Sequence, residues 1–104
     1  MPALDPLVFA RALADDTRQK LMQHVCCEWR SVGELAEMLG VSQPTVSHHL
    51  AILRDAGLVR VRPEGRQTFY TLNQDQVAAC CGRLMVRYAP EVAIPSSPSG
   101  GEAG

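Results

Sequence analysis

The sequence predicts a mainly α-helical domain with a single β-hairpin, in the order helix, helix, helix, helix, strand, strand, helix. Three observations predict this order. Apolar residues recur at helical spacing in the segments up to Gly57. A short glycine-containing turn, residues 40–42, separates the third helix from the fourth. Two segments rich in β-branched and aromatic residues, 58–62 and 67–72, then flank a turn at 63–66. The fold class is therefore a winged helix-turn-helix, with the hairpin as its wing.

The first two helices follow from their caps. The first runs from about Pro6 to Ala14. Asp15 and Asp16 are good residues to begin a second helix, which we expect to run to about Cys27. These two helices precede the helix-turn-helix.

The third and fourth helices have clear start and stop signals. Ser31 and Glu34 have the spacing of a capping box, and the helix that follows ends at Gly40, which supplies a left-handed residue. Ser42 caps the fourth helix, which tolerates a proline in its first turn and ends at Gly57. The two helices and their short turn form the helix-turn-helix.

The last helix begins after the hairpin. Asn73 caps it, and we expect it to run to about Ala89 and to stop at Pro90. Residues 1–90 are therefore assigned to one domain. Residues 91–104 are rich in Pro, Ser, Gly and Ala, and we expect them to form a disordered tail.

The chain length of 104 residues allows one compact domain with a small core. A chain of this size buries only about 60–65% of its extended surface, so we expect it to associate with a second copy. The sequence has no secretory signal pattern, and no segment approaches the roughly 18 apolar residues of a membrane helix. We expect a cytoplasmic protein with no membrane partner, whose cysteines are thiols or metal ligands rather than disulfides.

The fourth helix is predicted to have one apolar and one polar face. Val46, Leu50 and Leu53 follow i, i+4, i+7 spacing and are expected to face the core. The amino-terminal half of the helix then presents side chains that can hydrogen-bond base edges or phosphates in a major groove. These candidate DNA-binding residues are Ser42, Gln43, Thr45, Ser47 and His48. The alternative is an ordinary solvated face, but the preceding turn and the basic hairpin that follows favour DNA.

The hairpin adds three arginines. The chain has a net charge of −1, but its basic charge gathers between residues 42 and 72. Arg60 and Arg62 are predicted to leave the same face of the hairpin, and Arg66 lies at its turn. All three are candidates for contacts with phosphates or a narrow minor groove. Arginines kept for solubility are the alternative, a stronger one for Arg60 than for Arg66.

Several segments together resemble the ArsR/SmtB family of winged-helix metalloregulators. The matching segments are 13–18, 31–36, 41–50, 56–59 and the wing 64–72. The resemblance covers about residues 7–89. It implies a homodimer paired through the first and last helices, bound to double-stranded operator DNA with an inverted repeat. It also implies repression until an inducer binds.

The family's known sensing sites do not carry over to this chain. Where the arsenic-sensing form resembles Cys-Val-Cys, this sequence has Ser31, Val32 and Gly33. Where the zinc-sensing form has Asp and His pairs on the last helix, Asp75 is present but no histidine follows His49. Any sensing site must therefore use other residues.

The four cysteines form two adjacent pairs, and they are the candidate metal ligands: Cys26 and Cys27 near the end of the second helix, and Cys80 and Cys81 within the last. Thiolates suit soft ions, and trivalent arsenic takes three sulfurs, so two thiols from one helix and one from the other would serve. The expected inducer is arsenite or another thiophilic metal ion, with no obligatory cofactor. Thiol oxidation or persulfide sensing, and simple packing of cysteine like alanine, are the alternatives.

The sequence does not favour an enzyme. The cysteine pairs lack the two-residue spacer of thioredoxin-like sites, and no nucleophile elbow, P-loop or dinucleotide fingerprint occurs. We therefore expect a sequence-specific DNA-binding repressor that an inducer releases. A winged helix used only for protein interaction is the remaining alternative.

Overall fold

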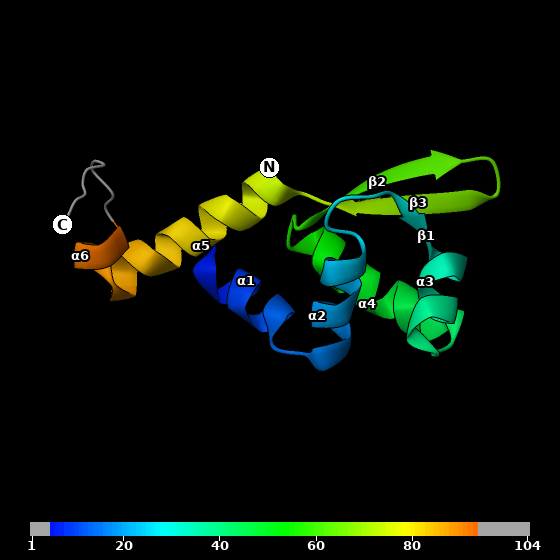
Figure 1. The fold of residues 1–104 in the computed structure, drawn as a ribbon, viewed down its shortest axis with the longest axis horizontal. Coiled ribbons are helices and arrows are strands. Elements are labelled where there is room, and N and C mark those ends of the chain that lie inside the picture. The colour runs from blue at the N-terminus through cyan, green and yellow to red at the C-terminus, as the bar shows by residue number, and fades with distance from the viewer. Residues whose placement is uncertain (1–4, 94–104) are drawn as a thin grey trace.

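The computed structural model describes residues 5–93. Its elements in chain order are α1 (Pro6–Leu13), α2 (Asp16–His24), β1 (Arg30–Ser31), α3 (Val32–Leu39), α4 (Gln43–Asp55), β2 (Val59–Glu64), β3 (Gln67–Leu72), α5 (Gln74–Tyr88) and α6 (Pro90–Ala93). The β2–β3 hairpin extends from one end of the helical body, and α5 runs beside α1 toward the other end (Figure 1). The predicted mainly helical fold with a hairpin wing is confirmed.

The core lies between the helices and the base of the sheet. Leu21 of α2, Leu35 of α3 and Leu50 of α4 have no exposed surface, and neither has Leu58 at the start of the hairpin. Burying a leucine side chain stabilises a fold by about 1.5–3 kcal/mol, so these contacts fix how the helices pack. The orientation of α4 is set mainly by this apolar packing.

The sheet has one strand more than predicted. Its order is β1-β3-β2, all antiparallel, and Tyr70 of β3 pairs with Arg30 of β1 on one side and with Val61 of β2 on the other. The hairpin turn is also shorter than the predicted 63–66, because Pro63 pairs with Thr68 inside the sheet. Proline is tolerated there because β2 is an edge strand and need not donate to a further neighbour.

The second helix is shorter than predicted, ending at His24 rather than near Cys27. The backbone carbonyl of Val25 instead accepts hydrogen bonds from the backbone N–H of Leu72, at 2.8 Å, and from the hydroxyl of Thr71, at 3.1 Å. These bonds from β3 replace the next helical turn. The first cysteine pair therefore lies in an irregular segment between α2 and β1.

The carboxyl-terminal boundary also differs from the prediction. α5 ends at Tyr88, just before the predicted stop at Pro90, but Pro90 then opens the short helix α6, which ends at Ala93 where a disordered tail was predicted. Residues 91–93 are thus helical, and the rest of the predicted tail, 94–104, lies outside the described residues. None of the described helices has the length and apolar character needed to cross a membrane.

Gly40 ends α3 with a left-handed backbone, at φ 70°. An added methyl group would meet nothing within 4 Å, so only the backbone conformation opposes a side chain there. We expect Gly40→Ala to lower the free energy of unfolding by about 1–2 kcal/mol. Gly40→Asn should cost less, because asparagine adopts this conformation more readily. Urea unfolding of the three proteins measures the difference, and equal losses for both variants would contradict it.

Candidate nucleic-acid interface and cysteine pairs

The amino-terminal half of α4 presents a polar face to solvent. Val46, Leu50 and Leu53 have no exposed surface, which fixes the opposite side of the helix outward. The exposed residues of that half include Ser42, Gln43, Thr45, Ser47 and His48. The structure therefore places every candidate residue of this helix on the surface.

The cap of α4 organises two of these residues. The hydroxyl of Ser42 accepts a hydrogen bond from the backbone N–H of Thr45, at 3.2 Å, and donates one to the Thr45 hydroxyl, at 2.9 Å. This pairing leaves the Thr45 hydroxyl a proton to donate. It also places both hydroxyls at the positive end of the helix dipole, where a phosphate is favourably placed.

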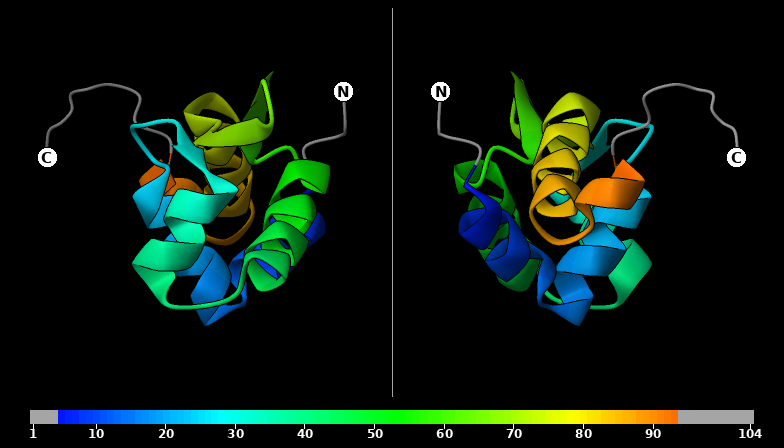
Figure 2. Two further views of the ribbon diagram at one scale, coloured as in Figure 1. Left: turned by 90° about the vertical axis from the view of Figure 1, so that its right-hand side faces the viewer. Right: turned by 90° about the vertical axis from the view of Figure 1, so that its left-hand side faces the viewer.

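The tip of the hairpin lies beside the start of α4. Gln43 and Ser47 share a hollow of about 310 Å³ with Arg66 at the hairpin turn and with Gly33 of α3. The side-chain nitrogen of Gln43 would lie 3.6 Å from a Cβ on Gly33, so it reaches across the start of α3. This end of the molecule faces the viewer in the left view of Figure 2. The structure thus brings Arg66 and the α4 residues into one surface.

Three other polar residues line this hollow that the sequence did not predict to lie at the DNA-binding surface: Ser31, Gln67 and Thr68. They come from β1 and β3, which pair over a long distance in the chain. No local pattern in the sequence indicates that pairing. Their place beside Gln43 is therefore visible only in the fold.

Arg60 and Arg62 are more engaged with the protein than Arg66. The Arg62 guanidinium lies 4.4 Å from the ring centre of Trp29, a cation–π contact, and its Nε lies 3.5 Å from Glu64. The Arg60 guanidinium lies 3.9 Å from the carboxylate of Asp75 on α5. Both side chains stay about half exposed, 57% for Arg60 and 45% for Arg62. They remain accessible, but their charges are partly balanced within the chain.

The cysteine pairs occupy two different settings. Cys26 is half-buried and Cys27 exposed in the segment after α2, while Cys80 is buried and Cys81 exposed on α5. In each pair the first cysteine is thus more buried than the second. A hydrogen bond with Cys27 raises the pKa of the Cys26 thiol, and burial raises the pKa of Cys80.

The first pair lies at the junction of the hairpin and α5. Cys26 and Cys27 line a hollow together with Arg60 of β2 and with Gln74 and Asp75 of α5. The side-chain nitrogen of Gln74 donates to the backbone carbonyl of Cys26, at 2.7 Å. An ion bound at this pair would therefore contact the region where the wing joins α5.

The three-sulfur arrangement expected from two helices is not assembled within one subunit. Cys80 and Cys81 do not line the hollow of the first pair. Across residues 5–93, no three His, Cys, Asp or Glu side chains converge in a way that could hold a metal ion. The two adjacent thiols Cys26 and Cys27 line one hollow together.

The fold and this polar surface define a winged helix-turn-helix of the transcription-regulator class rather than an enzyme. The family model for bacterial regulatory proteins of the arsR family matches residues 15–61. The chain is also 40% identical over 73 residues to the transcriptional activator HlyU of Vibrio cholerae, a match covering 70% of this chain and 68% of that protein. The chain belongs to the arsR family.

Two further proteins that resemble this chain carry names of transcriptional regulators. A "probable mercury resistance operon repressor" of Streptomyces lividans is 44% identical over 70 residues, which are 67% of this chain and 56% of the relative. The chain thus spans little more than half of that protein. A crystal structure described as a possible transcriptional regulator for arsenical resistance superposes with a TM-score of 0.71 at 30% identity, covering 86% of this chain and 90% of that one.

Proposed function

We propose that this chain is a dimeric cytoplasmic repressor. In this proposal α4 and the wing bind inverted-repeat operator DNA, and a soft metal or metalloid ion bound by cysteine thiolates releases it. The observation that carries the DNA-binding part is the shared surface of Gln43, Ser47 and Arg66 on the hollow between α4 and the hairpin tip. A polar helix face with a cation beside it fits a major groove and the phosphates along its edge.

Each residue of the α4 face suits a particular contact. Gln43 can bridge N6 and N7 of an adenine, and the Thr45 methyl can meet a thymine methyl. Ser47 and His48 can donate to base edges, while Ser42 at the helix start suits a phosphate. Arg66 at the hairpin tip suits a phosphate or a narrow minor groove, and Arg60 and Arg62 follow it along the wing.

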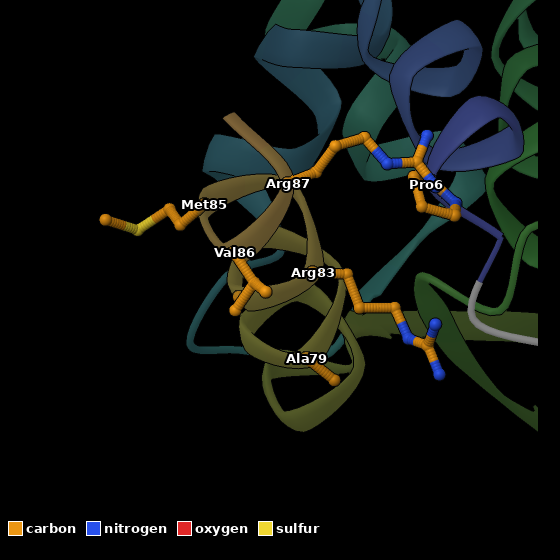
Figure 3. Close-up of a pocket in the computed structure, with 7 residues that line it drawn as sticks. Pro6, Ala79, Arg83, Met85, Val86 and Arg87 are labelled. Atoms are coloured by element: carbon orange, nitrogen blue, oxygen red, sulfur yellow. The ribbon is translucent and has the colours of Figure 1, made fainter. Parts of the chain in front are cut away.

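The second copy is expected to cover the exposed apolar side chains of α1 and α5. Val86 and Tyr88 of α5 are 57% and 73% exposed, and Leu7 and Val8 of α1 are also exposed. Met85 and Val86 stand on a different side of α5 from Arg87, whose side chain reaches toward Pro6 of α1 (Figure 3). Exposed apolar patches of this kind mark protein interfaces. For such a dimer to bind an inverted repeat, pairing through these side chains must hold the two α4 helices about 34 Å apart. They can then enter successive major grooves of the DNA.

Cys26 and Cys27 are the preferred inducer ligands among the four cysteines. They are adjacent, at least partly accessible, and share a hollow with the base of the wing. The raised pKa of Cys26 favours the protonated thiol, which slows its oxidation, and an ion that binds there must displace the proton. The names of two similar proteins, which refer to mercury and arsenical resistance, agree with a thiophilic inducer.

Operator binding is expected to fall steeply as salt rises. A dimer that makes about six phosphate contacts loses about a thousandfold in affinity between roughly 50 and 200 mM salt, because those contacts release counterions. Gel shifts with DNA from upstream of the chain's own gene measure this dependence. DNA affinity that does not change with salt concentration would favour a protein-interaction module. Association with another protein and not with DNA would favour it as well.

A further inference from the structure

A single arginine ties α4 to the end of α1. Arg18 of α2 donates from Nε to the backbone carbonyl of Ala12, at 2.7 Å, and from Nη2 to that of Arg11, at 3.2 Å. Its Nη1 lies 3.0 Å from Nδ1 of His49 on α4. The side chains of Arg18 and His49 are only 12% and 15% exposed. One guanidinium therefore connects three helices through directed contacts.

The contact with Arg18 fits one form of the His49 ring. A guanidinium has only donors, so the contact is a hydrogen bond when Nδ1 of His49 is the acceptor. That role belongs to the neutral ring that carries its proton on Nε2. A second proton would place an N–H against the Arg18 cation, and the contact would be lost.

The carboxylate of Asp15 is a second partner for the His49 ring when that ring is charged. Nδ1 of His49 lies 4.0 Å from the carboxylate of Asp15, which also lies 4.0 Å from Nη1 of Arg18. The backbone N–H of Arg18 donates to the Asp15 side chain at 3.0 Å. That bond lowers the pKa of the Asp15 carboxyl, with further lowering from the charge of Arg18 and, once its ring is protonated, from His49, so Asp15 stays ionised in mild acid. The ring of the titratable neighbour His48 also lies against His49, with 5.3 Å between the ring centres.

We propose that Arg18 is a positioning residue for DNA binding, which holds α4 in its binding orientation through neutral His49. Protonation moves the His49 ring from Arg18 to Asp15 and weakens operator binding. The link matters for DNA because His49 adjoins His48 on the exposed face of α4. The inference rests on the proposed DNA-binding function and adds a pH-sensitive contact to it.

The direction in which DNA affinity changes on acidification distinguishes this contact from a simple attraction between a charged histidine and the phosphates. A histidine that gains a positive charge near DNA strengthens binding through its attraction to phosphates. Loss of the Arg18 contact works in the opposite direction. His48 contributes only the first effect, and His49 contributes the second.

Two variants of His49 test the proposal. In His49→Asn the amide oxygen stands near the place of Nδ1 and accepts from Arg18 without titrating, whereas His49→Leu has no acceptor. Between about pH 8 and pH 5.5, the range in which imidazoles change charge, the affinity of the wild type relative to His49→Asn should fall about three- to tenfold. His49→Leu should bind more weakly than His49→Asn at every pH. Gel shifts with the upstream DNA fragment measure all three proteins.

Parallel pH profiles for the wild type and His49→Asn would overturn the proposal, as would equal affinities for His49→Asn and His49→Leu. Urea unfolding supplies a readout that needs no DNA. The midpoint difference between the wild type and His49→Asn should change over the same pH range, and a constant difference would also overturn the switch. If the wild type bound no upstream DNA at any pH, the proposed function would fail, and the unfolding data alone would decide whether the contact is pH-sensitive.

Discussion

The double variant Gln43→Ala, His48→Ala is expected to bind operator DNA about a hundredfold more weakly than the wild type, or worse. Each base contact contributes about 1–3 kcal/mol of discrimination, and every 1.4 kcal/mol is a factor of ten in affinity. Both side chains are exposed on α4, so their removal leaves the buried contacts of that helix intact. Gel shifts measure the loss, and sedimentation checks that the oligomeric state is unchanged.

The control for this variant is Gln23→Ala. Gln23 is an exposed glutamine on α2 and is not among the residues that line the hollow between α4 and the wing. It should leave DNA affinity within about twofold of the wild type, since isolated surface substitutions have small effects. An unfolded double variant would mean that the polar face of α4 has been assigned wrongly. A folded double variant with full affinity would remove α4 as the DNA-reading element.

The variant Cys26→Ser, Cys27→Ser is expected to stay on the operator in the presence of arsenite or mercuric ion. Loss of a partner outside the first ligand shell alone costs about 10- to 100-fold in metal affinity, so removal of both thiol ligands should cost more. Serine keeps nearly the volume of cysteine but gives a hard oxygen donor. Gel shifts with arsenite, antimonite, mercuric, cadmium, lead and zinc ions, followed by the same series with the variant, measure the response.

Cys81→Ser is the matched control, because Cys81 is exposed and adjacent to a buried cysteine but lies outside the hollow of the first pair. It should release DNA at the wild-type ion concentration. Normal release from the Cys26→Ser, Cys27→Ser variant would rule out this pair. Release of the wild type by peroxide or sulfane sulfur, but by none of the ions, would support the thiol-redox alternative.

Much of the fold was predictable because its signals are local. Ser31 and Glu34 form the capping box that their spacing predicts, with bonds of 2.8 and 3.1 Å. Gly40 adopts the left-handed conformation expected of a helix stop. The spacing of Val46 and Leu50 correctly indicates which face of α4 is buried. Each of these features depends on residues within a few positions of one another.

The missed features depend on distant partners. The two residues of β1 form a strand only because β3 lies beside them. α2 ends before the predicted position because the backbone carbonyl of Val25 accepts hydrogen bonds from Thr71 and Leu72 of β3. No window of the sequence contains both sides of these contacts, so neither a strand at 30–31 nor the end of α2 could be read from spacing.

The same limit applies to the candidate interface. Exposure of the α4 face follows from helical periodicity, and it was predicted residue by residue. The stacking of Arg62 on Trp29 and the contact of Arg18 with His49 join segments that are far apart in the chain. No pattern in the sequence assigns His49 a partner. Only the packing of α2 against α4 supplies one.

Trp29 also gives the unlabelled protein an optical reporter. It is the one tryptophan of the chain, and its indole meets both the Arg62 guanidinium and the hollow of Cys26 and Cys27. A phosphate that draws Arg62 away changes the polarity around the indole and shifts its emission maximum. A heavy ion on the two thiols quenches the emission instead. Binding of the wing to DNA should therefore shift the emission maximum of Trp29, whereas binding of the inducer should lower its emission intensity.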